Sequence, residues 1–361
     1  MALALLLTAG VALAHASTTP YLTRFHTIGT LASTVPANGD INPYGVAVIA
    51  HSTGNLVAGN VLVSNFNNSA NAQGTGSTIV QVTPGGAVSL FAHISLPGSA
   101  CPGGVGLTTA LGVLQRGWVI VGSLPTTDGT AATAGAGCLI VLDSTGQVVE
   151  TFADANINGP WDMTLADSGS SATLYVTNVL NGTVAAGGTV VDGGTVLRIS
   201  LSVPMQGSGI PSMGQETTIG SGFPERTDPA ALVIGPTGLA LSGSTLYVAD
   251  SLDNRIAAIA NAPTITASAG NGQDVTVGGA LNDPLGLALV PNGDLVAVNG
   301  NDGKAVEVTP AGAQVVVKVL DNTVTRGGKN GAGTLFGLAP VPGGGGLYFV
   351  DDGANTLNLL H

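Results

Sequence analysis

The stretch Pro236-Thr237-Gly238-Leu239-Ala240-Leu241, followed by Leu246-Tyr247-Val248-Ala249-Asp250 and then by Asn254-Arg255-Ile256, decides the fold. Its first two runs are short and apolar, a Ser-Gly-Ser turn separates them, and the second run ends at a small polar residue; this is typical of consecutive strands. Copies of the pattern begin near residues 43, 103, 159, 235, 283 and 335. Most copies add a third strand and, after a Gly turn, a fourth. Six units of four short strands predict an all-β protein folded as a six-bladed β-propeller.

The two ends of the chain are expected to meet in one blade. The last copy reaches His361 without a fourth strand, while residues 21–30 read as a strand that belongs to no copy. An open ring would leave an unpaired strand edge, which promotes aggregation. We therefore predict that residues 21–30 close the ring as the outer strand of the C-terminal blade.

The first residues have the features of an export signal. Residues 1–13 are almost wholly apolar, and Ala14-His15-Ala16 matches a signal peptidase site. The apolar run is shorter than the roughly 20 residues that a membrane-spanning helix needs. The sequence thus predicts a signal peptide over residues 1–16, cleaved after Ala16, and a single propeller domain over 17–361. A secreted, periplasmic or cell-surface protein with no transmembrane segment after cleavage is expected.

Composition restricts the partners. The 361 residues include 55 Gly, only 8% are charged, and 9 Lys and Arg stand against 21 Asp and Glu, for a net charge of −12. Binding to phosphate backbones requires clustered cations, so nucleic acid is excluded as a partner. A surface poor in charge and rich in amides favours a neutral polymer, a peptide or an envelope protein. We expect a monomer.

Both cysteines map to the top of one blade, where the inner strands start. Cys101 lies in the connection between the first two blades, and Cys138 begins the third strand of the second blade. Two cysteines in an exported protein favour a disulfide. No Cys/His cluster has the spacing of a zinc site.

The repeat over residues 235–256 resembles the NHL-repeat family of six-bladed propellers, and the resemblance extends more loosely over nearly the whole mature chain. Related gluconolactonase-like hydrolases hold a metal through Glu and Asn side chains where inner strands start. The chain carries no acid or amide at the matching positions, which are Tyr44, Gly104, Trp161, Thr237, Leu285 and Phe336. The lactonase pattern of metal ligands is therefore missing.

Candidate ligand-binding residues come from equivalent points of the repeat. The second strands end at Asn65, Ser123, Asn178, Asp250, Asn299 and Asp351. Six-fold repetition places these residues around the top mouth of the channel, with Tyr44, Trp161 and Phe336 as an aromatic floor. Oxygen ligands suit Ca²⁺, and the candidates to hold it are Asp250, Asp351, Asn178 and Asp162. The alternative interpretation is structural, because Asn and Asp also cap turns at strand ends and aromatic residues pack between blades.

Three functional hypotheses follow. No nucleophile elbow, dinucleotide loop or P-loop motif is present, so the first is a non-enzymatic binding or scaffold module. Its ligand face is the top, where residues 66–76, 124–137, 181–193 and 201–233 are expected to form long loops. The second is a Ca-dependent hydrolase or lyase of the gluconolactonase-like group. The third is a structural or adhesive surface component.

Overall fold

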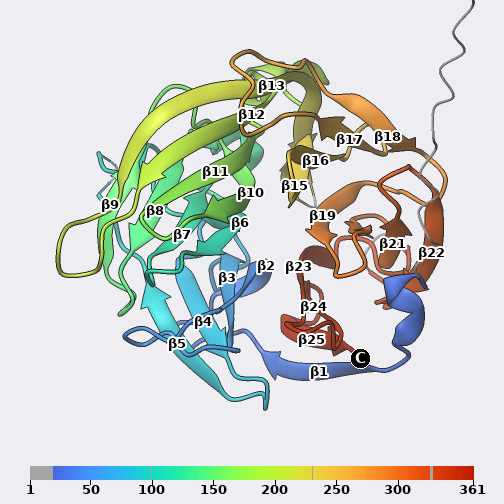
Figure 1. The fold of residues 1–361 in the computed structure, drawn as a ribbon, viewed down its shortest axis with the longest axis horizontal. Helices are drawn as coiled ribbons and strands as arrows, with labels where there is room; N and C mark the ends of the chain where they lie inside the picture. The colour runs from blue at the N-terminus through green and yellow to red at the C-terminus, as the bar shows by residue number, and fades with distance from the viewer. Residues whose placement is uncertain (1–18, 98, 230, 326–327) are drawn as a thin grey trace, which may run out of the picture.

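Six sheets surround a central channel in the computed structural model, which describes residues 19–97, 99–229, 231–325 and 328–361 (Figure 1). The predicted all-β, six-bladed propeller is confirmed. The first strand of every blade contacts the first strands of both neighbouring blades, so these six strands form the wall of the channel. We call the end where they start the top.

The blades follow one another along the chain. The first blade holds β2 (Ile41–Val48), β3 (Val61–Asn67), β4 (Thr78–Val82) and β5 (Val88–His93). The second holds β6 (Leu107–Val113), β7 (Val119–Ser123), β8 (Cys138–Leu142) and β9 (Val148–Phe152). The third holds β10 (Pro160–Asp167), β11 (Ser171–Asn178), β12 (Val191–Ser202), β13 (Ser212–Asp228) and the short β14 (Leu232–Ile234).

The remaining blades have four strands each. The fourth blade holds β15 (Pro236–Ser242), β16 (Thr245–Asp250), β17 (Arg255–Ile259) and β18 (Gln273–Val277). The fifth holds β19 (Pro284–Leu289), β20 (Leu295–Asn299), β21 (Lys304–Val308) and β22 (Gln314–Val319). The sixth holds β23 (Leu335–Pro340), β24 (Leu347–Asp351), β25 (Thr356–Leu360) and β1 (Ile28–Ser33).

The predicted ring closure is confirmed, with a shifted boundary. Strand β1 pairs antiparallel with β25, from Ile28 opposite Leu360 to Ser33 opposite Thr356. The first part of the predicted strand is instead a 3₁₀ turn, η1 (Tyr21–Arg24). Tertiary contacts explain the turn, because the backbone N–H of Leu22 donates to the buried carboxylate of Glu307 at 2.8 Å. This turn therefore fastens the N-terminal segment to blade five before β1 enters blade six.

The third blade departs most from the expected pattern. Residues 201–233 were expected to be a loop, but they contain all of β13, a 17-residue strand that pairs with β12. The sequence of β13 is rich in Gly, Ser and Thr and lacks the regular apolar alternation of a half-buried strand, so its pairing with β12 decides its structure. The expected loop 181–193 contains the single-turn helix α1 (Thr183–Ala186), and the loop 124–137 contains the 3₁₀ turn η2 (Ala131–Thr133).

The predicted disulfide is confirmed. Cys101 and Cys138 are bonded with an S–S distance of 2.07 Å, and both are fully buried. The bond ties the connection between the first two blades to the start of β8. Within the described ranges, no helix is long and apolar enough to cross a membrane. The predicted signal peptide, residues 1–16, lies outside those ranges.

Candidate functional site

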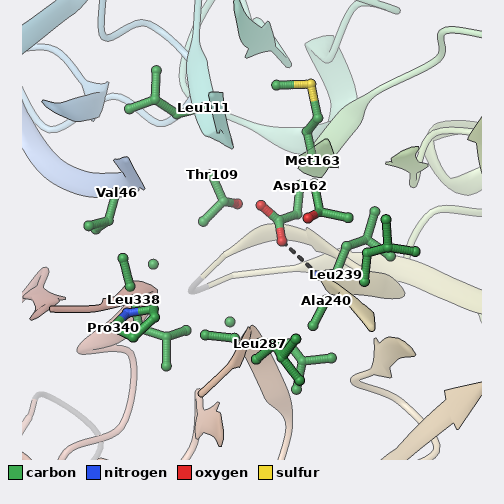
Figure 2. A pocket seen from close by; sticks show the side chains of 17 residues that line it. Val46, Thr109, Leu111, Asp162, Met163, Leu239, Ala240, Leu287, Leu338 and Pro340 are labelled. Atoms are coloured by element: carbon green, nitrogen blue, oxygen red, sulfur yellow. Dashed lines mark hydrogen bonds between the residues drawn. The ribbon is translucent and has the colours of Figure 1, made fainter. Parts of the chain in front are cut away.

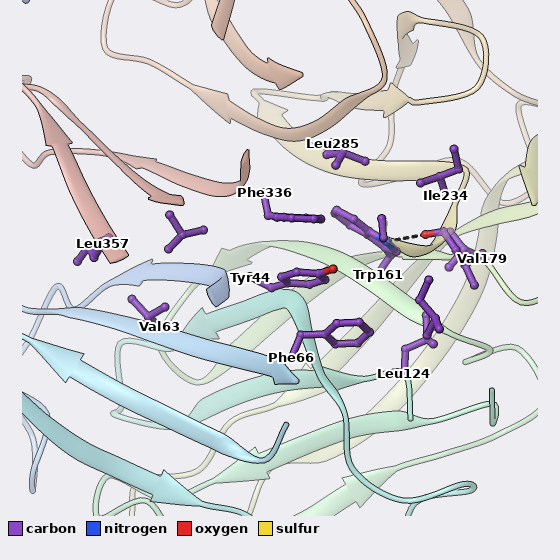
Figure 3. Close-up of a cluster of buried hydrophobic side chains, with 14 of the residues drawn as sticks. Tyr44, Val63, Phe66, Leu124, Trp161, Val179, Ile234, Leu285, Phe336 and Leu357 are labelled. Carbon is purple, nitrogen blue, oxygen red and sulfur yellow. Dashed lines mark hydrogen bonds between the residues drawn. The ribbon is translucent and has the colours of Figure 1, made fainter. Parts of the chain in front are cut away.

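The three predicted aromatic residues converge at the top of the channel (Figure 3). The ring of Tyr44 stacks on Phe336 with centroids 4.0 Å apart and on Phe66 at 4.4 Å. Trp161 lies 6.4 Å from both Tyr44 and Phe336, and its indole N–H donates to the Val233 carbonyl at 3.1 Å. All four rings are at most 2% exposed. Together with Leu285, they form an apolar cluster, the aromatic plug, that fills the channel near its top.

The six residues at the ends of the second strands are buried inside their blades. They are Asn65, Ser123, Asn178, Asp250, Asn299 and Asp351. The Asn178 Oδ1 accepts a hydrogen bond from the Asn158 N–H at 2.9 Å, and the Asn299 Oδ1 accepts one from the Asn282 N–H at 3.1 Å. Asn65 and Ser123 also bond to the segments that precede their inner strands. These side chains thus hold the loops that lead into the inner strands; direct ligand contact stays a prediction.

The four residues predicted to bind calcium are used in different ways. Asp250 pairs with the Arg255 Nε at 2.9 Å, and Asp351 accepts the Ala354 N–H at 2.9 Å. Burial raises the pKa of both carboxyls, to about 6 in Asp250, where Arg255 opposes the rise. Asp162 lies below the plug, in the wall of the channel. No three His, Cys, Asp or Glu side chains gather as a metal site among the residues that the structure describes. Calcium binding by these four residues stays a prediction.

A cleft of about 1080 Å³ lies on the top face, between the loops of blades one, five and six. Its walls carry the amide side chains of Asn42, Asn67, Asn71, Gln73, Asn301 and Asn355. The amides hold one another: Asn67 Nδ2 donates to Asn71 Oδ1 at 2.7 Å, and the Asn42 N–H donates to Asn355 Oδ1 at 2.8 Å. We call this feature the top cleft. None of these six amides was predicted to bind a ligand, although Asn67, Asn71 and Gln73 lie in the loop 66–76 that was expected on the top face.

Two acids near the plug were also missed by the sequence analysis. Asp352 lines the top cleft, and burial, followed by repulsion from Asp351, raises its pKa to about 8. Asp283 precedes β19 in a left-handed conformation, with φ of 59°, and burial, followed by repulsion from Asp228, raises its pKa to about 7. Burial also raises the pKa of Tyr44 well above its ordinary value. With these pKa values, Asp352 is mostly protonated and Asp283 about half protonated at pH 7. The only sequence signal was their position: Asp352 comes directly after the second strand of blade six, and Asp283 comes directly before the first strand of blade five.

The top cleft owes its shape to backbone conformations that Asn tolerates. Asn42, Asn71 and Asn355 have φ of 61°, 60° and 56°, in the left-handed region. Asn adopts this region more readily than most residues, because its short side chain can hydrogen-bond locally. These three residues form turns and also place a polar group on the cleft wall. In the sequence they look like ordinary turn residues, so the cleft was not recognised.

Comparisons with known proteins identify the fold. No protein-family model and no curated protein matches the chain. A gluconolactonase from Xanthomonas campestris is 13% identical with a TM-score of 0.54, over 92% of this chain and 88% of that chain. A calcium-binding regucalcin from Agrobacterium tumefaciens str. C58 is 12% identical with a TM-score of 0.57, over 91% and 92%. A luciferin-regenerating enzyme is 11% identical with a TM-score of 0.53, over 92% and 94%. The chain is thus similar in fold to gluconolactonase-like and regucalcin-like propellers, as the resemblance seen in the sequence implied.

Proposed function

We propose that the protein is a binding module whose top cleft recognises an uncharged ligand rich in hydroxyl or amide groups, such as a neutral polysaccharide or a peptide. The observation that carries this proposal is the set of amide side chains on the walls of a 1080 Å³ cleft. Each amide offers donors and acceptors together, which matches sugar hydroxyls and peptide groups. An exported location fits this role, because the ligand classes are those of a cell envelope.

The charge of the cleft supports an uncharged ligand. Asp352 and Lys329 are the only ionisable residues among those lining the cleft in the described ranges. Asp352 retains its proton near neutral pH because its pKa is raised to about 8. A phosphate or carboxylate ligand would need several cations or a bidentate Arg for tight binding. Lys329 alone offers little of that, so hydrogen bonding must provide the specificity.

The residues predicted from the repeat are given supporting roles in this proposal. The aromatic plug supports the cleft from behind, because Tyr44 and Phe336 follow two residues after Asn42 and Thr334 of the cleft wall. Four of the strand-end residues, Asn65, Ser123, Asn178 and Asn299, hold segments that lead into inner strands. A ligand that enters deeply would meet Tyr44, whose buried hydroxyl has no hydrogen-bond partner.

The test is an equilibrium titration of the mature protein with neutral oligosaccharides, neutral peptides and acidic oligosaccharides. We expect saturable binding to an uncharged class. The double variant Gln73→Ala, Asn301→Ala removes a half-buried and an exposed amide of the cleft wall. It should weaken binding roughly ten-fold, since two hydrogen bonds contribute about 0.5–1.5 kcal/mol each. The matched control is Asn55→Ala, an exposed amide in the turn between β2 and β3 on the bottom face. Binding to acidic chains only, or equal affinity in the double variant, contradicts the proposal.

A second candidate is a hydrolase or lyase that uses the protonated acids near the plug. Asp352 and Asp283, with pKa values raised to about 8 and 7, are suited to donate a proton near neutral pH. The similarity in fold to a gluconolactonase makes lactones the first substrates to test. Calcium binding by the four predicted residues stays a prediction, and the proton donors of this candidate are the two acids alone.

Two measurements separate this candidate from the first. Lactone and ester hydrolysis by the mature protein should be lost in Asp352→Asn and retained in Glu216→Gln, another acid with a raised pKa but on the outer strand β13. Metal analysis with and without chelator, combined with thermal unfolding, tests for calcium. Turnover that depends on Asp352 would replace the binding module as the main function.

A further inference from the structure

Below the aromatic plug, the channel contains a separate cavity of about 260 Å³ (Figure 2). All six inner strands contribute to its wall. The wall is mainly aliphatic, with one large side chain from each inner strand: Val46, Leu111, Met163, Leu239, Leu287 and Leu338. A dry apolar cavity of 150 Å³ is large enough for benzene, so this cavity can hold a small organic molecule.

Asp162 is the only titratable residue in that wall, within the part of the chain that the structure describes. Its Oδ2 accepts a hydrogen bond from the Leu239 N–H of the neighbouring blade at 2.8 Å. The Thr109 hydroxyl also lines the cavity, but it donates to the Trp161 carbonyl at 2.7 Å. Burial raises the pKa of Asp162 to about 7. The cavity therefore combines mainly aliphatic side chains and polar backbone atoms with a single carboxyl, whose pKa is raised to about 7.

The repeat shows that this carboxyl is an exception. The third position of the inner-strand motif is Gly in four other blades, at Gly45, Gly238, Gly286 and Gly337, and it is Asp162 in blade three. A Cβ at Gly286 would lie 2.0 Å from the Phe336 carbonyl oxygen, and one at Gly337 would lie 2.0 Å from the Tyr44 carbonyl oxygen. Those inner strands are too close to their neighbours for a side chain, whereas β10 and β15 leave room for a carboxyl between them.

The propeller fold does not require an acid at this position. A buried carboxyl is unfavourable unless it is fully paired, and Gly serves the same position in four blades. The Asp162 carboxyl lines the cavity and accepts the Leu239 N–H across the gap between β10 and β15, so its remaining lone pairs can accept a hydrogen bond from a ligand. A carboxylate is complementary to an ammonium group, and the surrounding aliphatic walls are complementary to hydrocarbon.

We propose that the cavity binds a small hydrophobic amine, whose ammonium group pairs with Asp162 while its hydrocarbon body contacts Leu239, Leu287 and Leu338. The binding is non-covalent. The amine enters with its proton, and Asp162 releases its own proton into solvent when it was protonated beforehand. This site is separate from the top cleft, because the aromatic plug lies between them, so either proposal can fail without the other.

The test is calorimetric titration of the intact mature protein with benzylamine, with benzyl alcohol as the uncharged ligand of equal size. We expect benzylamine to bind at least roughly ten-fold more tightly, as hydrogen bonds between charged partners exceed neutral ones. Asp162→Asn should abolish the difference, and the matched control Glu216→Gln, an acid with a pKa also raised to about 7, should retain it. Equal affinities in the unaltered protein, or no saturable binding of benzylamine, would overturn the proposal.

Two further readouts need no variant. The benzylamine affinity should fall by about ten-fold for each pH unit below the pKa of Asp162, because one proton must leave, while the benzyl alcohol affinity should stay constant. Methyl NMR should show benzylamine shifting the signals of Met163, Leu239 and Leu287. A flat pH profile, or shifts confined to residues of the top cleft, would contradict binding in the channel.

Discussion

The two ends of the central channel are built from the same repeat and differ in chemistry. At the second position of the inner-strand motif, the blades carry Tyr44, Trp161, Thr237, Leu285 and Phe336, and the rings among them close the top. At the fourth position they carry aliphatic residues, which line the cavity below. Six amide side chains line the cleft above the plug, and Asp162 is the one acid that lines the cavity below it, among the described residues. Positions that repeat form the propeller, and positions that deviate between blades give each end its own binding properties.

The plug is what keeps the two ends apart, and removing its largest side chain should have the largest effect. Trp161→Ala should reduce the free energy of unfolding by about 3–5 kcal/mol, as expected for a fully buried aromatic residue. The matched control is Trp118→Ala, a tryptophan 2% exposed in a different apolar cluster, with its N–H bonded to the Pro204 carbonyl. Chemical denaturation should show a similar loss in the free energy of unfolding for both variants. Only Trp161→Ala should also alter ligand binding at the top cleft. Equal binding in both variants would mean that the plug does not support the cleft.

The acid at the top should make stability fall as pH rises. The pKa of Asp352 is about 8 in the fold and near 3.9 in an unfolded chain. Between these values the folded state holds more protons, so the free energy of unfolding decreases from about pH 4 to pH 8. Asp352→Asn should flatten this slope. Its effect on the free energy of unfolding should be more stabilising at pH 8 than at pH 4 by at least about 1 kcal/mol. Denaturant titrations across this range provide the measurement; an unchanged slope would show that Asp352 is ionised in the fold.

The acid at the bottom should act in the same direction over a narrower range. Because the pKa of Asp162 is raised to about 7, its destabilising contribution develops between about pH 4 and pH 7 and then stays constant. Asp162→Asn should remove that part of the slope only. If the plug separates the ends, the double variant with Asp352→Asn should show additive changes, as independent sites do. A coupling energy well above about 0.5 kcal/mol would contradict the separation.

The smallest effect is expected at the Tyr44 hydroxyl. This group is buried and has no hydrogen-bond partner, and an unpaired buried polar group is unfavourable. Tyr44→Phe keeps the stacked ring and should increase the free energy of unfolding by up to about 1 kcal/mol. Thermal unfolding measures this change. A loss of stability would mean that the hydroxyl bonds to an internal water, which joins the top cleft to the plug.

The fold was predictable because it rests on repetition. The apolar runs around Leu239 and Leu246 recur six times, and the position of the unassigned N-terminal strand followed from the missing fourth strand at the end of the chain. The start of β1 was wrong by several residues, because the Leu22 bond to Glu307 connects parts of the chain 285 residues apart. Strand β13 was missed since it lacks an apolar period and depends on pairing with β12.

The site was less predictable because it rests on deviations. The meeting of Tyr44, Trp161 and Phe336 was foreseen from their shared position in the repeat. The top cleft was not, since Asn71 and Asn355 resemble ordinary turn residues until the loops of different blades are brought together. Likewise, Asp162 was considered as a metal ligand at the top, whereas the structure places it in the channel below the plug.

We propose above that the top cleft binds an uncharged ligand without a metal. The most direct measurement is a calorimetric titration with the tightest ligand from the panel, in chelator, at low and high salt, followed by recovery of the ligand. We expect one dissociation constant under all these conditions and an intact ligand, because hydrogen bonds between neutral groups are little affected by salt. Loss of binding with chelator, or conversion of the ligand to a product, would contradict it.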